Sequence, residues 1–175
     1  FLLGGAGAPS AAEHEQAVGS ADAAVAALHR GFLATPYRPT GLSTPARAIV
    51  RLVDELNWLN AVIQARDIAH PGSVARPTCE VEIAAAAVLE SGADLLEQPG
   101  GDRAALRAAV GDLRAALGVM ERSASLDLPV QRAPATPVPA GSEQRTSEFI
   151  SSLEPSFRAQ ELSFGVSQIA RNIDL

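Results

Sequence analysis

The sequence predicts an all-α fold, an antiparallel helical bundle of about five helices with one Pro-rich linker. Five segments place apolar residues at alternating spacings of three and four, the period of one face of an α-helix. No segment shows the sustained period-two alternation of a half-buried strand. A chain of 175 residues can bury roughly 70% of its unfolded surface, so the bundle needs no disulfide or metal to fold.

The first two helices are expected to be long and to bury their apolar stripes against one another. A capping box of Ser10 and Glu13 begins the first helix, which should run to about Ala34. Thr44, followed by proline, begins the second helix, which should end before His70. The stripes are Ala11, His14, Val18, Ala21, Val25, Leu28 and Phe32, and then Ile49, Leu52, Leu56, Leu59 and Ile63, widened by Val53 and Val62.

The third and fourth helices are expected to form a hairpin. The third follows Thr78 and stops at Gln98, and Asp102 caps the fourth after a short Pro-Gly-Gly break. Their stripes are Val81, Ala84, Val88 and Leu95, and then Leu106, Val110, Leu113, Leu117 and Met120. A second stripe on the fourth helix holds only small residues, which indicates either a close-packed neighbour or a compositional bias: Ala104, Ala108, Gly111, Ala115 and Gly118.

The chain after this four-helix core, residues 9–128, divides into a linker and a last helix. Residues 129–141 hold four prolines and no helical period, which is typical of a spacer, with a PxxP ligand as the rarer alternative. The last helix, within 142–175, should be kinked or restarted at Pro155. Its stripe is Leu162, Val166, Ile169 and Ile173, and Arg158 with Glu161 and Arg171 with Asp174 have the spacing of ion pairs.

Charge and motifs exclude several classes of function. The net charge of −6 argues against binding to nucleic acid or to anionic lipid, and all 14 basic residues are arginine. The phosphate-binding glycine loops, the Cys-x-x-Cys pair and the Glu-x-x-His pair of bundle metal sites do not occur. Cys79 is interpreted as structural, since nothing in the sequence brings a histidine to it. We therefore expect neither an enzyme nor a bound metal or cofactor.

One cluster has the composition of a ligand site. Asn57, Trp58, Asn60 and Gln64 lie within two turns of the second helix. The indole could stack on a planar aromatic carboxylate while the amides orient it. The alternative interpretation is that this Trp, the only one in the chain, belongs to the core or to an interface.

Two stretches resemble one protein family. Residues 152–164 (SLEPSFRAQELSF) with 169–174 (IARNID), and residues 48–56 (AIVRLVDEL), resemble the central region of FUSC-type proteins in their actinobacterial form. These are inner-membrane proteins of the fusaric acid resistance and aromatic acid exporter-like group. The resemblance covers about a third of the chain and implies a helical domain on the cytoplasmic face of the inner membrane, between two membrane blocks of a transporter. No catalytic residue is carried over from the family.

The resemblance also gives the two ends of the chain an expected role. Residues 1–8 would be a flexible join to a preceding membrane segment, and 142–175 would lead toward a following one. Leu162, Val166, Ile169 and Ile173 would then couple motion of the domain to that segment. The expected partners are the flanking membrane segments, with a second copy and an aromatic acid left open.

Two other functional classes stay open from the sequence. One is a free-standing helical interaction protein, and the other is a small-molecule-binding helical bundle. The sequence does not identify a cargo, a direction of transport or an energy source.

Overall fold

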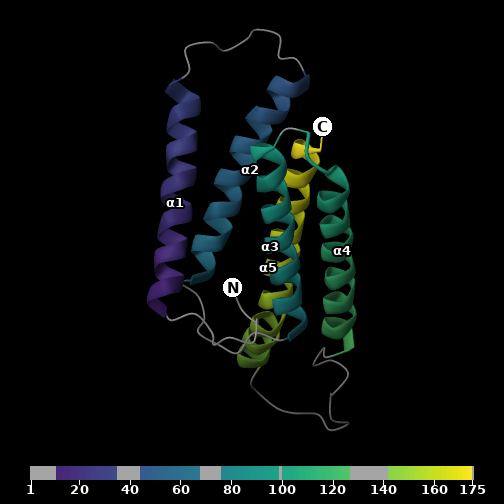
Figure 1. The fold of residues 1–175 in the computed structure, drawn as a ribbon. Coiled ribbons are helices and arrows are strands. Elements are labelled where there is room, and N and C mark those ends of the chain that lie inside the picture. Colours follow the sequence, from purple (N-terminus) through teal and green to yellow (C-terminus); the bar gives the residue numbers. More distant parts are fainter. Residues whose placement is uncertain (1–10, 35–43, 68–75, 99, 127–141, 175) are drawn as a thin grey trace.

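The computed structural model describes residues 11–34, 44–67, 76–98, 100–126 and 142–174, and these ranges form five helices without a strand (Figure 1). The helices are α1 (Ala11–Ala34), α2 (Thr44–Asp67), α3 (Arg76–Glu97), α4 (Arg103–Leu126) and α5 (Ser142–Ile173). The predicted all-α bundle is confirmed. The predicted linker and residues 1–8 lie outside the described residues.

The turn between α3 and α4 shows how local sequence sets the helix ends. The amide of Ala104 donates to Oδ1 of Asp102 at 2.8 Å, so Asp102 is the predicted cap of α4. Gly100 has a φ of +119°, a conformation that a residue with a side chain rarely adopts. The amide of Gly101 donates to the carbonyl of Gln98 at 2.8 Å and closes the turn. The two helices are therefore held as the expected antiparallel hairpin.

The helices are arranged around α5, with α1 outermost. Successive helices run in opposite directions, and α5 lies behind α3 in the view of Figure 1. α5 contacts α2, α3 and α4, and α3 also packs along α4. α1 packs against α2 at the edge of the molecule. The architecture is thus a three-helix unit of α3, α4 and α5, with α2 laid on α5 and α1 outermost.

The core forms where the predicted stripes of α3, α4 and α5 meet, with α2 contributing Leu59. Leu113 and Val81 are fully buried, and Met120 is nearly so. Complete burial of a side chain of this size stabilises the fold by about 1.5 to 3 kcal/mol. The core cluster is Leu59, Val81, Ala85, Val88, Leu106, Leu113, Met120, Ala159, Val166, Ile169 and Ala170.

The stripe of α1 is only half covered, against the expectation that it packs along its whole length. Val18, Val25 and Phe32 are half-buried, whereas Ala21 and Leu28 are exposed. No side chain described on α1 reaches full burial. The reason is that α1 packs extensively against only one other described helix, α2. A single neighbour covers only a narrow strip of a helix.

Two further expectations are settled on α4 and α5. A Cβ added to Gly111 would meet no atom within 4 Å, so no described neighbour packs on the small-residue stripe of α4 there. α5 runs through Pro155 as one helix, so a restart at that residue is not observed.

The expected ion pairs within α5 have other partners. Arg158 pairs with Glu154 and not with Glu161. Asp174 pairs with arginines of α4 and not with Arg171. Sequence spacing identifies only the neighbours on one helix. In the folded chain, Arg103 and Arg107 of α4 are better placed than Arg171 to pair with Asp174.

Candidate functional site

Trp58 packs on α5 with one face of its ring and is exposed to solvent over the rest. Its ring lies against Gly165, which is buried, so that a Cβ added to Gly165 would lie 3.1 Å from Cε3 of Trp58 and closer still to Cζ3. Only the absence of a side chain at position 165 allows this approach. The side chain of Trp58 remains 40% exposed. Trp58 therefore contributes mainly to the contact between α2 and α5, and part of its ring remains exposed to solvent.

The amides of the predicted cluster do not converge on the indole. Nδ2 of Asn60 donates to Oδ1 of Asp22 at 2.8 Å, so Asn60 faces α1. Asn57 and Gln64 lie within about 60° of Asn60 on the helical wheel, whereas Trp58 lies more than 90° from all three. Asn57 is exposed and Gln64 is half-buried. The structure thus divides the four residues between two faces of α2, and ligand binding there stays a prediction.

A second contact joins α2 to α5 beside Trp58. Nδ2 of Asn172 donates to Oε2 of Glu55 at 2.7 Å, and the pair is partly buried. A hydrogen bond to a carboxylate contributes about 1.5 to 3 kcal/mol when the acceptor is charged.

The four residues predicted to couple the domain to a membrane segment belong to the core. Val166 and Ile169 are buried, and Leu162 and Ile173 pack against the core cluster. Their stripe faces the neighbouring helices of the same bundle. Whether motion passes through α5 stays a prediction, but these side chains are already occupied in holding α5 in place.

The C-terminal end of α5 is fastened to the beginning of α4. Nε and Nη2 of Arg107 donate to the two carboxylate oxygens of Asp174 at 3.0 and 3.1 Å, a bidentate arrangement. Nη1 of Arg103 donates to the backbone carbonyl of Asp174 at 2.6 Å, which satisfies an orphan acceptor at a helix end. The side-chain hydrogen bond from Arg107 holds the pKa of Asp174 below its ordinary value, against a smaller desolvation effect, and the pKa of Arg107 is raised for the same reason.

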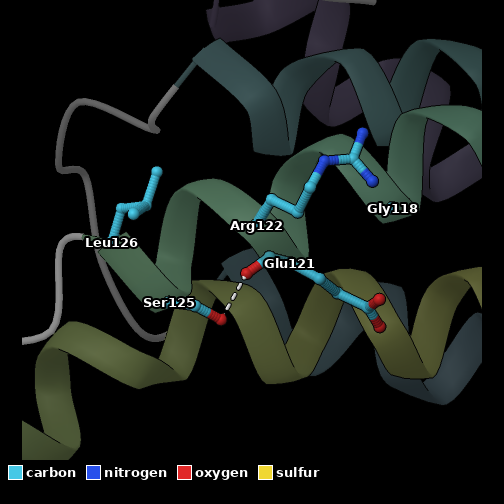
Figure 2. A pocket seen from close by; sticks show the side chains of 5 residues that line it. All are labelled: Gly118, Glu121, Arg122, Ser125 and Leu126. Carbon is cyan, nitrogen blue, oxygen red and sulfur yellow. Dashed lines mark hydrogen bonds between the residues drawn. The ribbon is translucent and has the colours of Figure 1, made fainter.

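Two shallow hollows lie along α4. Figure 2 shows the first, of about 420 Å³, lined by Gly118, Glu121, Arg122, Ser125 and Leu126. Its charged groups diverge, and the hydroxyl of Ser125 is used within the helix, donating to the carbonyl of Glu121 at 2.8 Å. The second hollow, of about 350 Å³, lies between α4 and α5 and is lined by Met120, Glu121, Ala124, Ser125, Ser156, Phe157 and Gln160. Neither includes Trp58.

Comparison with known proteins assigns this chain to no family. No family model, curated protein or solved structure matches it. Within the described ranges, no cluster of three or more His, Cys, Asp or Glu side chains could hold a metal ion. In those same ranges, no helix is both long enough and apolar enough to span a membrane.

Three features of the site region were not anticipated from the sequence. The contact of Trp58 with Gly165 joins residues 107 positions apart, and the tie of Arg107 to Asp174 joins residues 67 positions apart. Phe157 and Phe164 are 60% and 61% exposed on α5. Their spacing of seven, offset from the buried stripe of the same helix, was the signal that could have revealed a second apolar face.

Proposed function

We propose that this chain is an accessory domain of a membrane transporter that exports aromatic or other organic acids, acting at the cytoplasmic face of the inner membrane. One observation carries the proposal beyond the resemblance itself. The two stretches that resemble the family are far apart in the sequence, yet they lie on helices that pack together and share the hydrogen bond between Asn172 and Glu55. Two chance similarities would not be expected to lie on paired helices that share a part-buried polar contact. Their pairing therefore supports a single structural unit.

Within the transporter, the domain acts by positioning. Val166 and the rest of the core stripe lock α5 to α3, so α5 moves with the bundle as a rigid body. The tie of Asp174 to Arg107 fixes the end of α5 against α4. A displacement of the domain would therefore reach a following membrane segment through this end of the helix.

The topology places a requirement on the proposal. α1 begins at one end of the bundle and α5 ends at the other (Figure 1). A helix of 24 residues is about 36 Å long. If membrane segments flank the domain on both sides, both connections must reach the same face of the membrane. The polypeptide before α1 must then cover about this distance.

The experiment is export of a labelled aromatic carboxylate from cells that express the whole gene, with the vector alone as control. We expect lower accumulation with the gene, and open-reading-frame sequence on both sides of this region with apolar spans of about 20 residues. Equal accumulation, or a gene without such spans, overturns the transporter proposal.

The positioning role has its own variant. Asp174→Asn should lower export while the protein still inserts in the membrane, because it removes the bidentate charged contact with Arg107 and so weakens the tie of α5 to α4 without touching the core. Asp112→Asn, an exposed carboxylate on α4 outside this contact, is the matched control. Normal export by the Asp174 variant would remove the coupling role and leave the transporter proposal standing.

A further inference from the structure

α2 is anchored to α5 by contacts that do not involve α1. Leu59 belongs to the core cluster, and the ring of Trp58 lies against Gly165 of α5. Oε2 of Glu55 accepts the hydrogen bond from Asn172 of α5. These contacts follow one another over about one turn of α2. The packing of α2 on α5 therefore does not require α1.

α1, by contrast, is attached to the molecule by a narrow stripe. Val18, Val25 and Phe32 follow one another at a spacing of seven and are half-buried. Asp22 lies between the first two, and its Oδ1 accepts the hydrogen bond from Asn60 of α2 at 2.8 Å. α2 is the one described helix against which α1 packs extensively. A helix with so little buried apolar surface belongs to the parts of a structure that open most easily.

The surface of α2 that α1 covers includes Val53. Val53 is buried, although it is not part of the core cluster. It lies seven residues before Asn60, and residues seven apart lie on the same side of a helix, so Val53 faces α1. Because α1 and α2 run in opposite directions, Val53 lies beside the part of α1 between Val25 and Phe32 (Figure 1). Removal of α1 would therefore expose a side chain that is now buried.

We propose that α1 is a releasable strap, which opens from α2 as a unit while α2 stays packed on α5, and that the open form exposes the α2 surface around Val53. The first and last helices then respond differently to displacement. α5 is fixed by the core and by Arg107, so it moves with the bundle. A displacement of α1 opens the strap before it disturbs the core. The inference does not depend on the transporter proposal.

The test uses the reactivity of a thiol at the covered position. Val53→Cys places a thiol beneath the strap, and Val88→Cys, on α3, places one in the core. Iodoacetamide labelling is measured by mass spectrometry of the peptide that holds each position, and circular dichroism verifies folding. The native Cys79, which is buried on α3, is measured in the same molecules as a second reference.

The thiol of Val53→Cys should be labelled at least about tenfold faster than that of Val88→Cys. Its labelling rate should also depend less on urea, because opening of the strap exposes less surface than unfolding of the bundle does. Equal rates and equal urea dependence at the two positions would overturn the proposal, because α1 would then leave α2 only when the whole bundle unfolds.

A substitution at the far end of α1 tests whether the strap opens as a unit. Val18 is more than about 10 Å along the helix from the part of α1 that covers Val53. Val18→Ser removes half-buried apolar surface with little change in helix propensity, and it should speed labelling of the Val53→Cys chain by about two- to tenfold. Val119→Ser, at an exposed position on α4, is the matched control and should leave the rate unchanged. If Val18→Ser leaves the rate unchanged, the thiol is reached without release of α1, and the strap is refuted.

Discussion

Because Trp58 contacts Gly165, replacing Gly165 with alanine should destabilise the native chain but stabilise a variant that lacks the indole of Trp58. Alanine at position 165 would place a Cβ 3.1 Å from Cε3 of the indole and closer still to Cζ3, whereas ordinary contacts begin near 3.4 Å. The ring or the two helices must therefore move apart. Overpacking of this kind costs about 1 to 3 kcal/mol.

Helix propensity acts in the opposite direction. Gly165 lies inside α5, where alanine is more favourable than glycine by about 1 kcal/mol. The net effect of Gly165→Ala in the native background should be a loss of up to about 2 kcal/mol. In a Trp58→Ala background the obstacle is gone, so the same substitution should stabilise the protein by about 1 kcal/mol.

The assay is urea unfolding of the four members of this double-mutant cycle, followed by circular dichroism. The coupling energy should equal the overpacking cost, about 1 to 3 kcal/mol. Trp58 is the only tryptophan, so its fluorescence emission should also shift to the red in Gly165→Ala as the ring moves into water. Gly111→Ala is the matched control, because it meets no atom within 4 Å and should stabilise both backgrounds alike. Equal effects of Gly165→Ala in the two backgrounds would refute the contact.

Three other predictions follow from burial and charge. Leu113→Ala should lower the free energy of unfolding by about 2 to 5 kcal/mol, whereas Val119→Ala on the exposed side of α4 should change it by less than about 0.5, and similar losses would contradict the assigned core. Because the folded pKa of Asp174 lies below its ordinary value of 3.8, the stability that its charge provides is complete above that value and is lost as the pH falls through the folded pKa. The difference in melting temperature between the native chain and Asp174→Asn should therefore be constant above about pH 5 and shrink below about pH 4, and a constant difference at every pH would rule this out. Native-state hydrogen exchange should show all of α1 opening together at a lower free energy than α4, and protection in α1 equal to that of α4 would argue against its peripheral packing.

The fold class was predictable because the helical period and the end signals are local properties. Asp102 caps α4 as its side chain and position indicate, and the stripe of α4 buries Leu106, Leu113 and Met120. A period identifies which side of a helix is apolar. It does not identify how many neighbours that side will meet, and this is why the stripe of α1 is left half exposed.

The candidate site could not be predicted to the same extent, since it depends on which helices lie side by side. Trp58 and Asn60 are neighbours in the sequence, but one faces α5 and the other faces α1. Asp174 had a basic residue at helical spacing and nevertheless pairs with Arg107, because that guanidinium reaches both of its oxygens. Choices of this kind are made by tertiary packing between distant segments.

The position of α5 decides where a functional change can occur without loss of the fold. Its core stripe is shared with three other helices, so a charge at Val166 would unfold the bundle before it could report on any coupling. The end of α5 at Asp174 is partly exposed to solvent, and substitution there leaves the core cluster intact. Variants at Asp174 therefore separate function from folding: loss of export by a variant that keeps the stability of the bundle indicates the tie to α4.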